Sequence, residues 1–187
     1  MPRLVVLASG SGTTLQAILD DPELRPRVVA AGTDVPQCRA MKRAADAGVP
    51  SFAVPLADFA DRAAWNAALA DEIAAHEPDL VVLAGFMRLL APAVVTRFRI
   101  VNTHPALLPA FPGAHAIRDA LAAGVDTTGV TVHWVDEGVD TGPVVAQVTV
   151  PVEPDDDEES LRLRIQAAEK PLYLATLKQL CQEIAPR

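Results

Sequence analysis

The sequence predicts an α/β fold: a Rossmann-like, mostly parallel sheet with helices on both faces and an antiparallel strand pair near the C-terminal part. Three observations predict it. Short apolar runs alternate with stretches of helical periodicity, a glycine-rich turn follows the first apolar run, and two strand-like segments lie close together after residue 130. Strands that alternate with helices imply parallel pairing, whereas a short turn between two strands implies antiparallel pairing.

Apolar runs bounded by glycine, proline or polar residues are the predicted strands of the parallel part. Leu80–Ala84 gives the strongest signal, because five apolar residues in a row are stopped by Gly85. The predicted strands are Leu4–Ala8, Val28–Ala31, Ser51–Val54, Leu80–Ala84 and Ile100–Asn102.

The stretches between these runs carry helix signals. Gly48 follows one of them and Pro78 another, and both residue types commonly end helices. The predicted helices are Thr13–Leu19, Cys38–Ala47, Arg62–His76 and Ala116–Ala123.

The pattern changes in the last third of the chain. Val130–Val135 alternates with a period of two, and Val144–Val150 is a second strand only a short turn away, so we expect an antiparallel pair. Ser160–Ile184 is predicted to be helical, with Pro171 expected to kink or split the helix. The acidic run at 155–159 favours the N-terminus of this helix over a metal site.

Size and charge limit the function. The 187 residues suit one domain, and no apolar run approaches the ~18 residues of a membrane span. A net charge of −8 disfavours nucleic acid and anionic membranes as partners. Cys38 and Cys181 match no metal-ligand spacing, and without a secretion signal they indicate a cytoplasmic protein.

The turn after the first strand, Ser9–Thr14, has the composition of an anion site. Its glycines allow close backbone approach, and the following helix offers free N–H groups and a positive dipole end. The turn is also an imperfect dinucleotide fingerprint, because Leu15 stands where a third glycine belongs, although Asp34 is placed like a ribose-binding acid. A tight turn without any ligand is the plain alternative.

Asn102 and His104 end a predicted strand two residues apart, so an extended chain places both side chains on one face. An amide beside an imidazole can stabilise a developing oxyanion and move a proton. Asp140 lies in the turn between the two late strands, and a carboxylate that reached His104 would stabilise its imidazolium form. A loop histidine and an ordinary polar turn are the alternatives.

Three segments, in this order, resemble the glycinamide ribonucleotide (phosphoribosylglycinamide) formyltransferase family: Leu80–Leu90 (LVVLAGFMRLL), Asn102–Pro112 (NTHPALLPAFP) and Val139–Gln147 (VDTGPVVAQ). The resemblance runs nearly end to end, and the three segments are specific together. It implies transfer of a formyl group from 10-formyltetrahydrofolate, as co-substrate, to the amine of glycinamide ribonucleotide in de novo purine biosynthesis. It implies neither a metal nor a nicotinamide.

The resemblance also implies which residues are catalytic and which parts of the chain bind each substrate. Asn102, His104 and Asp140 would be the catalytic trio, with Asn102 also touching the folate. Residues 1–187 would form one formyltransferase domain, in which about 1–100 bind the phosphate and about 101–187 carry catalysis and folate binding.

Further residues are implied as binding groups. Gly12, Thr13 and Thr14 would hold the substrate phosphate, although the family more often has Ser-Asn at the last two positions, and Glu169 would hold the ribose. The implied folate contacts are Arg62, Met87, Arg88, Leu89 and Leu90. Without the resemblance, these would be a helix-surface arginine, a strand-to-helix turn and, for Glu169, a solvated helix acid.

Other functions stay open as alternatives. Two relatives, methionyl-tRNA formyltransferase and the formyl hydrolase that acts on formyltetrahydrofolate, carry extra domains, and we expect neither because the catalytic domain begins at Arg3 and the chain ends at Arg187. A nicotinamide-dinucleotide-binding oxidoreductase and a non-catalytic small-molecule binding module are the rivals from other classes. We expect a cytoplasmic enzyme of small-molecule substrates, with a homodimer among its states.

Overall fold

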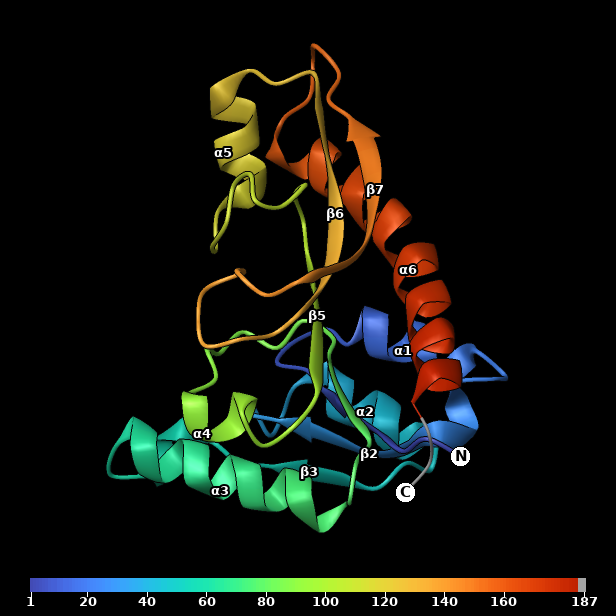
Figure 1. The fold of residues 1–187 in the computed structure, drawn as a ribbon, viewed down its shortest axis with the longest axis vertical. Helices are drawn as coiled ribbons and strands as arrows, with labels where there is room; N and C mark the ends of the chain where they lie inside the picture. Colours follow the sequence, from blue (N-terminus) through green and yellow to red (C-terminus); the bar gives the residue numbers. More distant parts are fainter. Residues whose placement is uncertain (185–187) are drawn as a thin grey trace. The chain divides into compact units, whose positions relative to one another are not determined.

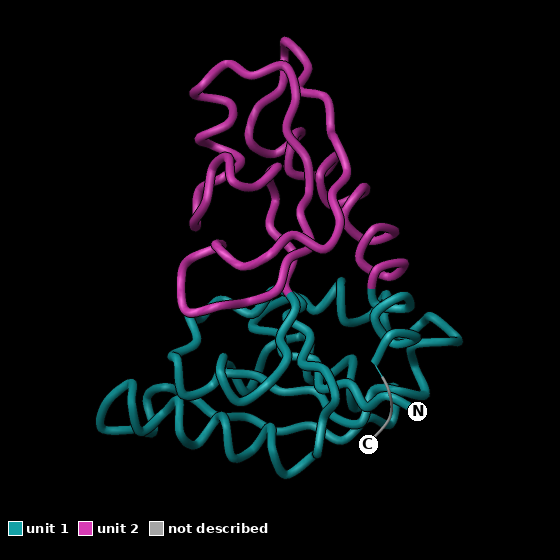
Figure 2. The backbone as a smooth tube through the Cα atoms, viewed as in Figure 1, with its two compact units in different colours: residues 1–101, 177–187 teal, residues 102–176 magenta. Residues whose placement is uncertain are grey.

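The computed structural model describes residues 1–184 and divides the chain into two units (Figure 2). Unit 1 holds Met1–Val101 together with the segment that starts at Leu177, and unit 2 holds Asn102–Thr176. The chain therefore passes between the units within one strand, β5 (Ile100–His104), and within one helix, α6 (Glu158–Glu183).

Unit 1 is built on parallel strands in the order β3-β2-β1-β4-β5 (Figure 1). The central strands β1 (Leu4–Leu7) and β4 (Leu80–Leu83) are buried along their whole length, which is what their unbroken apolar sequences predict. The remaining strands are β2 (Val28–Thr33) and β3 (Ser51–Ala53). The predicted parallel sheet is confirmed.

The helices of unit 1 are α1 (Thr13–Asp20), α2 (Arg39–Asp46), α3 (Arg62–Ala75) and the short α4 (Pro92–Val95). Helix α1 packs beside α2, and α3 packs beside α4. Because crossovers between parallel strands are right-handed, this strand order places the two pairs on opposite faces of the sheet. The single-turn helix α4 and the 3₁₀ turns Arg25–Arg27 and Leu56–Asp58 are too short for a periodicity argument to find.

Unit 2 contains the antiparallel pair β6 (Thr127–Trp134) and β7 (Val144–Pro151), in which Val130 lies opposite Val148. These two strands follow β5 in the strand order of the seven-stranded sheet. The helix α5 (Ala116–Ala123) and the first part of α6 complete the unit. Its core is a cluster of buried apolar residues from β6, β7 and α6: Val130, Val150, Leu161 and Ile165.

Helix α6 corrects one prediction. It begins at Glu158, inside the acidic run, with the Ser160 N–H donating to Asp157 Oδ1 at 2.8 Å, and it continues through Pro171. Of the two outcomes predicted for Pro171, a split helix is therefore wrong, and a kink stays a prediction. Proline removes one N–H donor, but its fixed φ is compatible with a helix, and buried residues on both sides of it, Ile165 and Tyr173, hold the helix in place.

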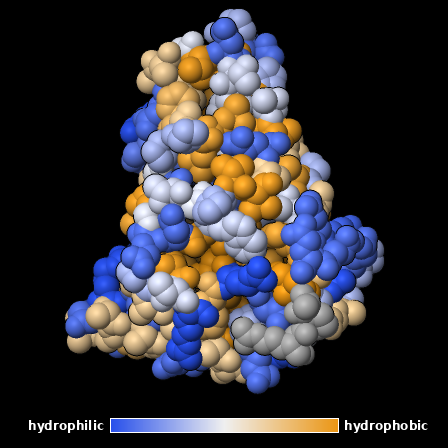
Figure 3. All heavy atoms as spheres, viewed as in Figure 1, coloured by the Kyte–Doolittle hydropathy of each residue, from blue (hydrophilic) through white to orange (hydrophobic). Residues whose placement is uncertain are grey.

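Hydrophilic and hydrophobic residues are interspersed on the face of each unit that Figure 3 presents. The exposed large hydrophobic residues of unit 1 include Met87 and Leu89, and those of unit 2 include Val139, Val144 and Leu163. Within the described part of the chain, none of the helices has the length and apolar character needed to cross a membrane.

Candidate active site

Strand β5 ends in three polar residues. Its first two residues, Ile100 and Val101, are fully buried, whereas Asn102 and Thr103 are half-buried. His104 is 4 % exposed, so an ionisable ring lies almost entirely inside the protein. Because a buried polar ring requires hydrogen-bond partners, the partners of His104 show which residues form the site with it.

His104 lies between a carbonyl and a carboxylate. Its Nε2 is 2.7 Å from the carbonyl oxygen of Phe111, and because a carbonyl only accepts, Nε2 carries a proton. Its Nδ1 is 3.3 Å from Oδ2 of Asp140. Both ring nitrogens of His104 therefore face acceptor oxygens of the protein.

Asp140 lies in the turn between β6 and β7 and has a left-handed backbone conformation, with φ of 55°. Its Oδ2 also accepts the N–H of Gly113 at 2.8 Å, and its Oδ1 is 3.6 Å from Nε2 of His133. The structure thus brings Asp140 to His104, a contact that spacing alone does not establish.

His133 belongs to the same cluster, although no sequence motif singles it out. Its Nδ1 lies 2.9 Å from the carbonyl oxygen of Trp134 and therefore carries the proton in the neutral ring. Its Nε2 then accepts from the Asn102 amide nitrogen at 3.4 Å. The sequence feature that could have identified His133 is its place two residues after Thr131, because two polar residues then lie on one face of a buried strand.

The loop 105–113, which supplies two of these contacts, is fixed by side chains of β6 and β7. The buried Thr131 hydroxyl donates to the carbonyl of Ala106 at 2.7 Å and accepts the N–H of Leu108 at 3.0 Å. Gln147 Nε2 donates to the Leu108 carbonyl at 3.0 Å and to Thr131 Oγ1 at 2.9 Å. The loop therefore presents its own carbonyl and N–H groups to the histidine and the aspartate in a defined position.

Glu169 on α6 contacts β5. Thr103 Oγ1 donates to Glu169 Oε1 at 3.1 Å. Burial, with a smaller contribution from the Glu169 carboxylate, holds the pKa of the Tyr173 hydroxyl well above its usual value. The Tyr173 hydroxyl is therefore neutral, and the Glu169 carboxylate lies next to the polar end of β5.

The loop between β1 and α1, in unit 1, presents backbone rather than side chains. Gly12 is the N-cap of α1, with φ of 70°, and no side chain caps the helix. The first N–H groups of a helix have no partner within it, so they can bind an anion. Helix α2 holds the loop from outside, since Ala40 N–H donates to the Gly10 carbonyl at 3.1 Å and Arg43 Nε to the Ser11 carbonyl at 2.9 Å. Thr13 is exposed.

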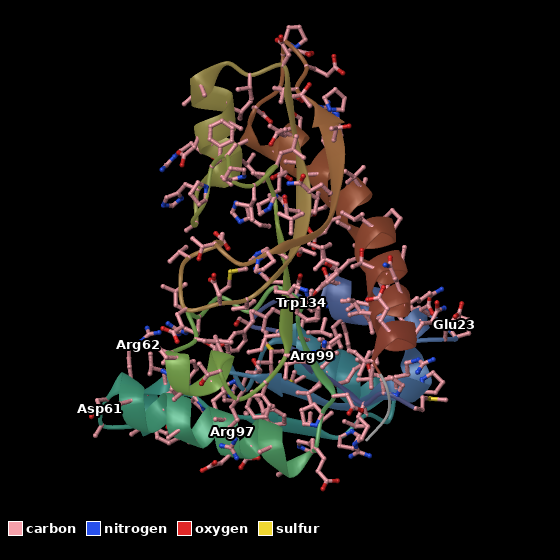
Figure 4. The ribbon with its side chains drawn as sticks, in the orientation of Figure 1. Glu23, Asp61, Arg62, Arg97, Arg99 and Trp134 are labelled. Atoms are coloured by element: carbon pink, nitrogen blue, oxygen red, sulfur yellow. The ribbon has the colours of Figure 1, made fainter. Side chains whose placement is uncertain are left out.

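The residues implied as folate contacts also lie in unit 1. Figure 4 shows Arg62 at the start of α3, and its Nη2 donates to the carbonyl of Leu89 at 2.8 Å. The side chains of Met87 and Leu89 are exposed, whereas Arg88 and Leu90 are half-buried. Arg62 and the segment after β4 are thus in contact.

Asp34 does not present its carboxylate as a dinucleotide-binding acid would. Its side chain is 2 % exposed, and Ser9 Oγ and Arg88 Nε both donate to it. The oxygens that would accept from a ribose are already occupied, which counts against the oxidoreductase alternative. Among residues 1–184, no group of three or more His, Cys, Asp or Glu is arranged to hold a metal ion.

The comparisons with a family model, with other proteins and with solved structures all indicate the same family. A family model described as formyl transferase matches residues 2–177. The chain is 56 % identical over 182 residues to the phosphoribosylglycinamide formyltransferase of Mycobacterium tuberculosis, covering 95 % of this chain and 84 % of that protein. It is 37 % identical to the Bacillus subtilis protein of the same name, over 96 % and 95 % of the two chains. The crystal structure of glycinamide ribonucleotide transformylase 1 from Symbiobacterium toebii matches with a TM-score of 0.93 at 44 % identity, over 98 % and 89 % of the chains.

Proposed function

This chain belongs to the formyl transferase family, and on that premise we propose that it transfers the formyl group of 10-formyltetrahydrofolate to the amine of glycinamide ribonucleotide. The observation that carries the proposal is the cluster on β5, in which Nδ1 of His104 lies 3.3 Å from the Asp140 carboxylate while Asn102 shares the same strand. An imidazole, a carboxylate and an amide together can supply the proton transfer and the oxyanion stabilisation that acyl transfer between two amines uses.

The proposed reaction is a direct attack. The unprotonated amine of the ribonucleotide forms a bond with the formyl carbon, and the carbonyl oxygen becomes an oxyanion. Collapse of this intermediate breaks the bond to the folate nitrogen, which receives the proton that the attacking nitrogen loses. The products are formylglycinamide ribonucleotide and tetrahydrofolate, and the step uses no enzyme nucleophile.

Each member of the cluster has a part in this scheme. The amide of Asn102 and the charge of protonated His104 stabilise the oxyanion, an electrostatic contribution that a fixed site makes without reorganisation. Asp140, 3.3 Å from Nδ1 of His104, orients the imidazole and relays the proton through water. Asn102 also contacts the folate, and the turn at 137–142 closes over its ring system.

Other residues bind the two substrates in this proposal. Gly12, Thr13 and Thr14 hold the phosphate through backbone N–H and hydroxyl groups, and Glu169 binds the ribose. The folate contacts are Arg62 and the segment Met87, Arg88, Leu89 and Leu90. Support comes from the free helix start at Gly12 and from the contact of Arg62 with Leu89.

The proposal extends to the setting of the enzyme. Residues 1–187 act as a single formyltransferase domain in the cytoplasm on small-molecule substrates, without metal, nucleic acid or membrane, and with a homodimer among the states of the enzyme. The net charge of −8 supports the exclusion of nucleic acid and anionic membranes.

A product assay tests the function directly. Purified protein is incubated with both substrates, and formylglycinamide ribonucleotide and tetrahydrofolate are quantified by mass spectrometry. We expect equal amounts of the two products and no reaction without the ribonucleotide. Release of formate without the ribonucleotide would indicate the hydrolase alternative, and binding of NADH in place of tetrahydrofolate would indicate the oxidoreductase.

A further inference from the structure

The segment that follows β4 is held at several points along its backbone. The N–H of Met87 donates to Ser9 Oγ at 2.9 Å, and the carbonyl of Leu89 accepts from Arg62 at 2.8 Å. The N–H of Ala91 donates to Asn66 Oδ1 at 2.9 Å. Contacts from the loop after β1 and from α3 therefore fix the backbone, while the side chains of Met87 and Leu89 remain exposed.

Asp34 is the carboxylate to which one of these contacts leads, through Ser9, and with which the side chain of Arg88 also pairs. Ser9 Oγ donates to Oδ1 of Asp34 at 2.5 Å, and Arg88 Nε donates to Oδ2 at 2.6 Å. The hydroxyl of Ser9 also accepts the N–H of Met87. Asp34 thus reaches the segment in two ways: through the side chain of Arg88, and through Ser9 to the backbone of Met87.

The surroundings of Asp34 make this arrangement rigid. Its side chain is 2 % exposed, whereas that of Arg88 is 39 % exposed. A buried carboxylate without partners is strongly unfavourable, so Asp34 holds its donors in one geometry. It stands directly after β2, which is paired with the central strand β1, so its position is set by the sheet rather than by a loop.

We propose that Asp34 is the positioning residue of the folate-binding segment Met87–Leu90, acting through Arg88 and Ser9 without touching either substrate. The inference rests on the proposed function, because that function makes this segment the folate site. It gives a role to an acid that the sequence pattern associates with a dinucleotide ribose. Well-positioned binding groups need support of this kind from a second layer of residues.

The first test is Asp34→Asn, which keeps the shape of the side chain but removes the charge and turns an amide N–H toward one of its donors. We expect the KM for 10-formyltetrahydrofolate to rise about tenfold, since displaced binding groups lose affinity on this scale. We expect kcat and the KM for the ribonucleotide to stay within about threefold. The matched control is Asp46→Asn, which removes an exposed carboxylate 2.9 Å from Lys42 on α2 and should change neither KM.

A double-mutant cycle separates positioning from general destabilisation. Arg88→Gln alone should raise the same KM, and Asp34→Asn should add little in that background, because both changes break one contact. Ser9→Ala, which removes the bridging hydroxyl, should raise the folate KM in the same direction by less. If circular dichroism shows that the Asp34→Asn protein is unfolded, Ser9→Ala takes its place in the test. Equal rises in both KM values, an unchanged folate KM, or independent effects of Asp34 and Arg88 would overturn the inference.

A direct binding measurement distinguishes a failure of this inference from a failure of the proposed function. Calorimetry with tetrahydrofolate gives Kd for wild type and Asp34→Asn without any turnover. If wild type binds tetrahydrofolate but transfers no formyl group, the proposed function fails, while a weaker Kd for Asp34→Asn still supports positioning. Equal Kd values contradict positioning even in an active enzyme, and a wild type that neither binds nor reacts contradicts both.

Discussion

The loop after β1 in unit 1 and the polar cluster on β5 in unit 2 offer polar groups to ligands by different means. The loop offers backbone N–H groups at the start of α1, and Gly12, with φ of 70°, sets its conformation. The cluster is made of side chains from β5, β6 and the turn after β6, and each of them lies within 3.6 Å of another member that is distant in sequence.

This difference determines how each region responds to substitution. A backbone-built site depends on conformation at one or two positions and tolerates exchange of neighbouring side chains. A side-chain cluster depends on each member, and its members affect one another's energies. The predictions below are ordered from the largest expected effect to the smallest.

Asn102→Ala should have the largest effect on the rate. It removes an amide donor that the proposed mechanism directs at the oxyanion, and losses of this kind are ~10²–10³ in kcat, or ~2.7–4 kcal/mol. Steady-state kinetics with both substrates saturating measures the change, and circular dichroism checks the fold. A folded Asn102→Ala enzyme within a few-fold of wild type would remove Asn102 from the mechanism.

Gly12→Ala should weaken binding of the ribonucleotide phosphate by the loop after β1, and Gly10→Ala should leave it unchanged. A Cβ at Gly12 would lie 2.6 Å from the Cα of Ala40, in a backbone conformation that costs L residues about 1–2 kcal/mol, whereas a Cβ at Gly10 meets nothing within 4 Å. We expect the ribonucleotide KM to rise about tenfold or more for Gly12→Ala, which corresponds to about 1.4 kcal/mol. Similar KM values for the two variants would show that the loop is not the phosphate site.

Thr131→Val tests how the cluster is supported, and Thr128→Val on the same strand is its control. The Thr131 hydroxyl pairs with two backbone groups of the loop 105–113, whereas the buried Thr128 hydroxyl has no hydrogen-bond partner among residues 1–184. Loss of the Thr131 hydroxyl leaves buried groups unpaired and should cost about 1–3 kcal/mol of unfolding free energy, with a several-fold lower kcat. Thr128→Val should be neutral or stabilising, and denaturant unfolding of both variants measures the difference. Equal losses would mean that the hydroxyl does not anchor the loop.

The double variant Thr13→Ser/Thr14→Asn should have the smallest effect. It restores the residue types that the formyltransferase family more often has, while the backbone at Gly12 is unchanged. We expect the ribonucleotide KM to stay within about threefold of wild type. A much larger change would show that the side chains of the loop, rather than its backbone, hold the phosphate.

Local sequence patterns predict most of the fold. Unbroken apolar runs such as Leu80–Ala84 predict the buried parallel strands, here β4 (Leu80–Leu83). The period-two run at Val130–Val135 predicts the antiparallel strand β6, although β6 begins earlier, at Thr127. Two features escape such patterns. The helix α4 has only four residues, and Pro171 lies inside a continuous helix because buried neighbours outweigh its missing N–H.

The candidate site divides in the same way. The Gly12 loop is visible in the sequence because glycines and a helix start are neighbours in the chain. The contact of His104 with Asp140 is visible only through a family resemblance, since no spacing rule connects two residues that meet by tertiary folding. The pairing of Asp34 with Arg88, 54 residues apart, and the place of His133 beside Asn102 need the structure for the same reason.

A double-mutant cycle on His104 and Asp140 tests most directly whether the cluster acts as one unit. The quantity measured for each variant is the single-turnover rate of formyl transfer at saturating folate. If both side chains act on one transition state, His104→Ala/Asp140→Ala should be little slower than the slower single variant. Losses that multiply in the double variant, or folded single variants that keep transfer within a few-fold of wild type, would contradict a shared catalytic role for these two residues.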